Sequence, residues 1–99
     1  MLRTLQKAIE QRTEVGNYDS YYYVYSDDMI YQVVEYHKTA ICKFSSKYYM
    51  IDKSYGSVST TRACNDCDKY CKEKGLIKLT KEEWNIYIKN NKEEIPDDL

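Results

Sequence analysis

Between residues 20 and 52, tyrosine and β-branched residues recur with a period of two, which is typical of strands with one buried face. Turn-forming pairs or triplets interrupt this pattern at residues 26–28, 37–38 and 45–46. The short connections predict an antiparallel meander of four strands, within residues 20–52. Alternation places Tyr31 and Val33 on one face of the second strand and Val34 and Tyr36 on the other. In the third strand it places Ala40, Cys42 and Phe44 on one face.

Helical patterns flank this strand region on both sides. Apolar residues at helical spacing predict a first helix over residues 2–14, with Gly16-Asn17 as the stop. A second helix is predicted over about 60–74, with Ser59 or Thr60 as its N-cap and Gly75 as its end. Thr80 and Glu83 form a capping box that opens a third helix over 81–91. The expected fold is α+β and a single domain, 1–99: a four-stranded antiparallel sheet with the N-terminal helix and both C-terminal helices packed on one face.

The composition excludes several classes of protein. Leu, Ile, Val and Phe make up only about a fifth of the chain, so twelve tyrosines must supply much of the apolar area. The net charge of −1 argues against a general nucleic-acid binder, which is normally basic. No apolar run approaches the roughly 18 residues of a membrane span, and the N-terminus is charged. We therefore expect no membrane partner, a cytoplasmic location and reduced cysteines.

Four cysteines are candidate ligands or core residues. Three of them have the spacing C-x2-C-x3-C on the predicted second helix, and the fourth lies on a strand. Four thiolates can hold zinc, and an iron–sulfur site or a redox-active pair are further alternatives. Positions i, i+3 and i+7 are also those that a helix buries against a sheet, and cysteine is a good small hydrophobe. Plain core packing, with no cofactor, is the favoured interpretation for Cys42, Cys64, Cys67 and Cys71.

Catalytic motifs are not found in the sequence. His37 is the single histidine, at a predicted hairpin turn, and three glycines cannot build a phosphate-binding loop. We therefore expect that the protein is not an enzyme and that it has no catalytic residues.

Two groups of residues are candidate binding sites. Hydroxyls and a guanidinium gather where the second helix begins, a place that suits an anion, although N-capping explains one of the hydroxyls. This candidate anion site comprises Ser59, Thr60, Thr61 and Arg62. Strand tyrosines on an open sheet face would suit a protein partner, because residues 17–58 carry four basic and five acidic groups and so lack the excess charge that nucleic acid requires. The candidate partner-binding residues are Tyr21, Tyr23, Tyr25, Tyr31 and Tyr49.

The stretch from Tyr36 to Arg62 resembles a family of short proteins encoded by bacteriophages, with a tyrosine- and threonine-containing hairpin followed by a Ser/Thr-rich helix start. Cys42 stands where that family has alanine. The resemblance implies a viral accessory role in the host cytoplasm. The matching residues are Tyr36, Thr39, Ile41, Tyr55, Ser57, Thr60, Thr61 and Arg62.

These observations predict a non-enzymatic phage accessory protein that binds and blocks a host protein, as an anti-defence inhibitor would. One alternative is a nucleic-acid or nucleotide-binding module that uses Arg62, Lys69 and Lys72 with stacking tyrosines. A second alternative is a small metal-binding domain built on the four cysteines. A homodimer formed through the open sheet face is a further expectation.

Overall fold

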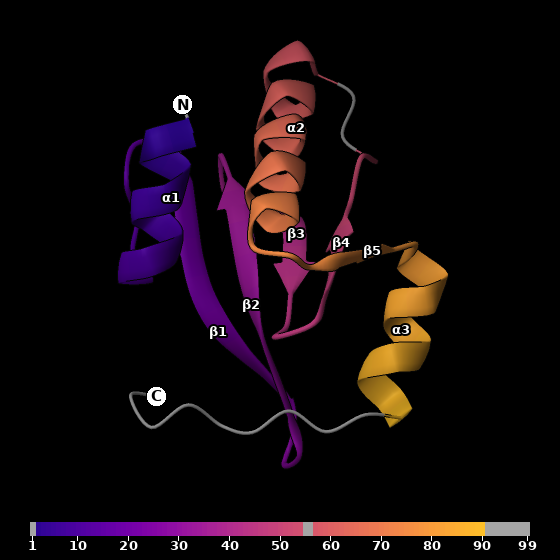
Figure 1. The fold of residues 1–99 in the computed structure, drawn as a ribbon. Coiled ribbons are helices and arrows are strands. Elements are labelled where there is room, and N and C mark those ends of the chain that lie inside the picture. Colours follow the sequence, from indigo (N-terminus) through magenta and orange to yellow (C-terminus); the bar gives the residue numbers. More distant parts are fainter. Residues whose placement is uncertain (1, 55–56, 91–99) are drawn as a thin grey trace.

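The computed structural model describes residues 2–54 and 57–90. Within these residues the chain forms three helices and five strands. Their packing (Figure 1) gives an α+β globule of 34 × 29 × 23 Å. The fold class is therefore confirmed. The elements are α1 (Leu2–Gln11), β1 (Tyr18–Ser26), β2 (Met29–Tyr36), β3 (Thr39–Phe44), β4 (Tyr48–Ile51), α2 (Val58–Glu73), β5 (Ile77–Leu79) and α3 (Lys81–Asn90).

The sheet has five strands in the order β1-β2-β3-β4-β5, so the prediction of four strands is incomplete. The first four strands form the expected antiparallel meander. The fifth strand runs parallel to β4, with Tyr48 opposite Ile77 and Met50 opposite Leu79. Three residues are too few to show a period of two, and the pairing depends on α2 returning the chain to this edge.

The helices cover both faces of the sheet, and the prediction that all three share one face is wrong. Helices α1 and α2 lie side by side over one face (Figure 1), where they bury Leu5, Ala63 and Cys67 in a first core. Helix α3 packs on the opposite face, where Trp84 joins Tyr31 in a second core. Because β5 occupies the sheet edge and α3 begins two residues after it, the chain emerges on the side that α2 does not cover.

The prediction that Ala40 shares a face with Cys42 and Phe44 is wrong, because β3 contains a β-bulge. The register shifts between Val34 and Glu35, so that Val34 lies opposite Cys42 but Glu35 lies opposite Ala40. Ala40 therefore packs at the second core, whereas Cys42 and its neighbour Ile41 belong to the first. The predicted facing of β2 is confirmed, since Tyr31 and Val33 lie in the second core and Val34 and Tyr36 in the first.

Local sequence signals explain the helix ends. Helix α1 ends three residues earlier than predicted, because Arg12 already adopts a positive φ of 51°. Helix α2 starts at Val58, and Ser57 rather than Ser59 or Thr60 is its N-cap. The capping box of α3 is confirmed: Thr80 Oγ1 accepts from the Glu83 N–H at 3.1 Å, and Glu83 Oε1 accepts from the Thr80 N–H at 2.9 Å. Residue 91, the predicted end of α3, lies outside the described residues.

A buried polar chain ties α1 to the sheet. The Gln32 Nε2 group donates to the Ile9 carbonyl and to Ser20 Oγ, both at 2.8 Å, and Ser20 Oγ donates to the Val33 carbonyl at 2.9 Å. Because these buried groups satisfy one another, the last turn of α1 is fixed over β1 and β2. None of the helices within residues 2–54 and 57–90 is long and apolar enough to cross a membrane.

Candidate functional site

The structure separates the five candidate tyrosines. Tyr21, Tyr23 and Tyr31 lie on the face that α3 partly covers, while Tyr49 lies on the α2 face and is fully buried. Tyr31 is buried as well, against Trp84, with ring centroids 5.3 Å apart. The expectation that Tyr31 and Tyr49 stand on an open face is therefore wrong: each fills one of the two cores.

Large apolar side chains remain exposed near the tip of the β1–β2 hairpin. Tyr23, Val24 and Tyr25 are 47%, 55% and 40% exposed, and the exposed turn residues Asp27 and Asp28 follow after Ser26. Figure 1 shows that this hairpin extends past the helices at one end of the sheet. We call the three large side chains and the two aspartates the hairpin patch. Three consecutive exposed side chains of this size form the kind of surface that protein interfaces use.

Neighbouring rings support the hairpin patch from behind. The Tyr23 ring lies 5.3 Å from the Tyr31 ring, which meets Trp84 edge to face. Two residues before Tyr23 on β1, the Tyr21 hydroxyl donates to Glu35 Oε2 at 2.7 Å. Burial, together with this hydrogen bond, raises the pKa of Tyr21 to about 12. Tyr21 and Tyr23 are therefore held in place by their neighbours within the protein.

The hairpin carries charge of one sign. Residues 13–36 include five acidic residues and no basic residue. Two cations lie over tyrosine rings of this hairpin: the Arg12 guanidinium is 5.3 Å from the Tyr22 ring centre and the Lys43 ammonium is 5.8 Å from that of Tyr31. The hairpin patch is therefore aromatic and locally acidic, although the whole chain is nearly neutral.

The four cysteines are buried in the first core, as core packing predicts. The sulfur atoms of Cys42 and Cys71 are 4.0 Å apart, and Cys64 Sγ donates to the Asp52 carbonyl at 3.5 Å instead of joining them. Hydrogen bonds with Cys67 and Cys71, added to burial, raise the pKa of Cys42 well above its usual value. In the described part of the chain, no three His, Cys, Asp or Glu side chains are placed to hold a metal ion.

At the start of α2 most hydroxyls serve the helix itself. Ser57 Oγ accepts from the Thr60 N–H at 3.1 Å and donates to Thr60 Oγ1 at 2.7 Å. The Thr61 hydroxyl donates to the Ser57 carbonyl at 3.1 Å. Ser59 and Arg62 are exposed, and Thr61 and Arg62 line an open hollow beside Val58. The four predicted anion-binding residues are neighbours on one turn, where the geometry is that of an N-cap.

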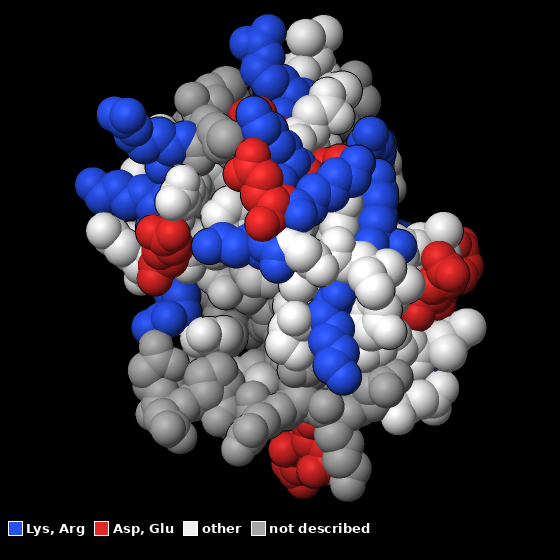
Figure 2. All heavy atoms as spheres, viewed as in Figure 1, with Lys and Arg blue, Asp and Glu red and all other residues white. Residues whose placement is uncertain are grey.

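Basic side chains gather over α2, which covers the face of the sheet opposite to that of Tyr23. Figure 2 shows Lys and Arg over α2, where Arg62, Lys69 and Lys72 are exposed. Lys72 is also committed to an ion pair with Asp68 at 3.0 Å. Because α2 covers the first core while Tyr23 and Tyr31 belong to the other face, the cations and exposed tyrosines do not form one surface.

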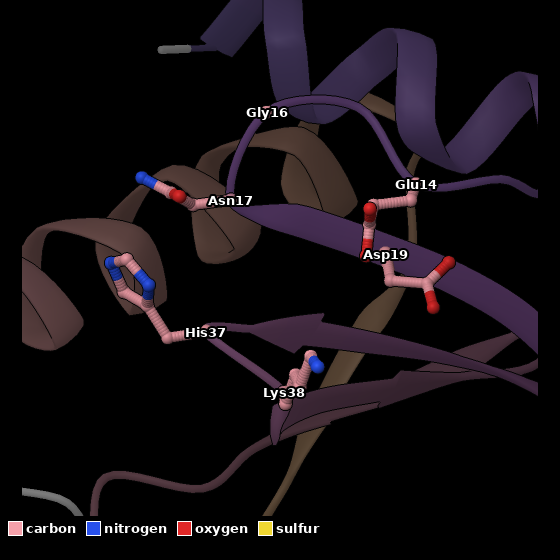
Figure 3. Close-up of a pocket in the computed structure, with 6 residues that line it drawn as sticks. All are labelled: Glu14, Gly16, Asn17, Asp19, His37 and Lys38. Atoms are coloured by element: carbon pink, nitrogen blue, oxygen red, sulfur yellow. The ribbon is translucent and has the colours of Figure 1, made fainter.

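A hollow of about 220 Å³ lies at the other end of β1, lined by charged and polar side chains (Figure 3). His37 and Lys38 both have positive φ there, 50° and 65°, as a two-residue hairpin turn requires. In Figure 3 the His37 and Asn17 side chains point away from the carboxylates of Glu14 and Asp19. The side chains do not converge on a common point, so the hollow has the character of an open surface.

Sequence reasoning missed Val24, the most exposed apolar member of the hairpin patch, because alternation assigns it to the face opposite Tyr23 and Tyr25. The detectable signal is the Asp27-Asp28 turn, which shows that β1 ends in a hairpin tip where both faces can meet solvent. Of the residues that carry the resemblance to phage proteins, Tyr55 lies outside the described residues. Comparison of the chain with protein-family models, curated proteins and solved structures finds no match.

Proposed function

We propose that this chain is a non-enzymatic binding protein whose hairpin patch docks on a partner protein. The observation that carries the proposal is the run Tyr23, Val24 and Tyr25, exposed on both faces of one hairpin strand. With the resemblance of residues 36–62 to phage-encoded proteins, the partner is a host protein that the complex blocks, as an anti-defence inhibitor would. Tyrosine is enriched among the residues that dominate binding energy in such interfaces.

Replacing Tyr23 and Tyr25 together by alanine tests the proposal. Each truncation of an interface hot spot costs about 2 kcal/mol, or roughly 30-fold in affinity, so the double variant should lose almost all binding. The partner is identified by affinity capture from host lysate and mass spectrometry, and its dissociation constant is then measured by calorimetry. Circular dichroism and thermal melting verify that the variant is folded.

Ile86→Ala is the matched control for this experiment. Ile86 is a large apolar residue that is 61% exposed on α3, outside the hairpin patch. This variant should bind the partner with the affinity of the unchanged chain. Equal binding by the folded Tyr23→Ala/Tyr25→Ala variant would contradict the proposal, and a stronger loss from Ile86→Ala would move the docking site to α3.

A second candidate function is nucleic-acid binding, favoured by the Lys and Arg side chains that Figure 2 shows over α2. Such a complex releases counterions, so its affinity should fall steeply with salt concentration. The Arg62→Ala/Lys69→Ala variant should abolish it and leave binding at the hairpin patch unchanged. A weak salt dependence of the measured affinity would remove this candidate.

A further inference from the structure

The outer edge of β1 is open along part of its length. β1 is the terminal strand of the sheet, and within the described ranges only Val15 pairs with its outer side. The Val15 N–H donates to the Tyr18 carbonyl at 2.8 Å and the Tyr18 N–H donates back at 3.1 Å. The backbone groups of Tyr18 therefore point away from β2.

The outward direction of the Tyr18 groups fixes which other backbone groups of β1 also face outward. Successive residues of a strand point their N–H and C=O groups to opposite sides, so Ser20, Tyr22 and Val24 share the outward direction of Tyr18. The carbonyl of the preceding residue, Asn17, points the other way, toward β2, and accepts from the His37 N–H at 2.9 Å, which agrees with this alternation. The Ser20 N–H is already engaged by the Asp19 carboxylate at 2.8 Å. The open stretch is therefore Tyr22 to Val24, next to the hairpin patch.

Proteins usually protect such an edge, and here the protection is partial: α1 packs against β1, and the register with β2 shifts between Val24 and Ser26. β1 contains no Lys, Arg or Pro, the residues that commonly block the addition of another strand. The opposite sheet edge is different: β5 has only three residues, one of which is Lys78, and both α2 and α3 pack beside it. The β1 edge is thus the side of the sheet suited to strand addition.

Charge decides what occupies this edge. A second copy pairing through β1 would bring together two hairpins that each hold four acidic residues and no basic residue over 18–36. Like charges in register oppose that arrangement, whereas a basic strand would be attracted to it. Building on the proposed function, we propose that the open edge of β1 takes an extended, Lys- or Arg-rich segment of the partner protein as a sixth strand. Its side chains then alternate between Tyr21 and Tyr23 on one face and Tyr22 and Val24 on the other.

The first test uses a synthetic nine-residue peptide of alternating lysine and valine with the full-length protein. Hydrogen exchange followed by NMR should show the amides of Tyr22 and Val24 slowed at least tenfold by the peptide. Two further peptides carry N-methyl groups on all lysines or on all valines. Because only alternate residues of an added strand bond to the edge, one of these should lose at least tenfold in affinity and the other should stay within twofold.

Equal binding of both methylated peptides, or protection elsewhere in the chain, would overturn strand addition. An alternating glutamate–valine peptide should bind at least tenfold more weakly, and equal binding would overturn the assignment of a basic occupant. Slowed exchange of Tyr22 and Val24 that grows with protein concentration, without peptide, would identify a second copy as the occupant instead.

Val24→Pro separates this inference from the proposed function. Proline removes the outward N–H of Val24 while leaving the bonds between β1 and β2, and Val24→Thr is the control that keeps both the N–H and the branched shape. Both variants change the Val24 side chain, so the comparison between them isolates the N–H: folded Val24→Pro should bind the partner at least tenfold more weakly than Val24→Thr. If Val24→Pro binds fully while Tyr23→Ala/Tyr25→Ala does not, edge pairing is wrong and the hairpin patch stands. Full binding by Val24→Pro and also by Tyr23→Ala/Tyr25→Ala overturns the proposed function itself.

Discussion

Asp68 on α2 holds three elements together through one carboxylate. It accepts from the Tyr49 hydroxyl of β4 at 2.8 Å and pairs with Lys72 of its own helix and with Lys78 of β5. Burial alone would raise the pKa of Asp68, but the hydrogen bonds from Lys72, Tyr49 and Lys78 outweigh it and lower the pKa to about 2. The i,i+4 spacing to Lys72 is visible in the sequence, whereas the contacts with Tyr49 and Lys78 depend on the tertiary fold.

Asp68→Asn should therefore destabilise the protein in a pH-dependent way. The pKa of this carboxyl is below its ordinary 3.8 in the folded state, so its stabilisation is present above about pH 4 and is lost as the pH falls toward 2. We expect a loss of about 1–2 kcal/mol at pH 7, after allowing for the exposed lysines, and a gap that closes near pH 2. Urea denaturation at several pH values measures it.

Asp66→Asn is the control for that measurement. Asp66 lies on the same helix, but its buried Oδ2 atom has no hydrogen-bond partner among the residues that the structure describes. Its substitution should not lower stability at pH 7. A destabilisation by Asp68→Asn that is equal at pH 2 and pH 7 would contradict the electrostatic account.

At the scale of elements, local signals predicted the existence and type of every described element except β5, but not how the elements are placed. The capping box at Thr80 and Glu83 identified the start of α3, and the turn residues separated β1 to β4. The face that α3 covers was not predictable, because Trp84 and Ile88 form an apolar stripe that fits either side of a sheet. The bulge at Ile41 was equally hidden, since an extra residue in one strand leaves alternation looking regular on either side of it.

Trp84 is the residue through which α3 is fixed, and its substitution should loosen that element. It is fully buried against Tyr31 and Tyr87, and truncation to alanine should cost about 3–5 kcal/mol. Trp84→Phe should cost less, because the indole Nε1–H has no hydrogen-bond partner within residues 2–54 and 57–90 to lose. Urea denaturation followed by circular dichroism measures both, with Ile86→Ala expected to change stability little. Equal costs for the alanine and phenylalanine variants would contradict this account.

At the scale of the whole molecule, one sheet separates two cores, and the first holds all four cysteines. Burial is the main cause that raises the pKa of Cys64, while hydrogen bonds to neighbouring thiols raise that of Cys42. Thiol reagents attack thiolates that solvent can reach, so these groups react only when the fold opens.

The native protein should therefore react with an aromatic disulfide reagent at least about 100-fold more slowly than the protein in urea, where four thiols should titrate. If the cysteines are core residues, a strong chelator should leave the melting temperature within about 1 °C of its value without chelator. Absorbance of the released thiolate and thermal melting measure the two. Rapid reaction of the native thiols, or a large drop in melting temperature on chelation, would support the metal-binding alternative instead.

The sequence by itself determined the α+β class, the meander of β1 to β4, the three helices and the burial of the cysteines, because each follows from residue periodicity and from capping or turn residues that act over a few positions. Only the tertiary structure decided that β5 joins the sheet, that α3 covers the second face and that Tyr31 and Tyr49 are enclosed. Those outcomes depend on which surfaces meet across long stretches of chain, where many arrangements satisfy the same local pattern. The exposed hairpin patch and the open edge of β1 are what that packing leaves uncovered.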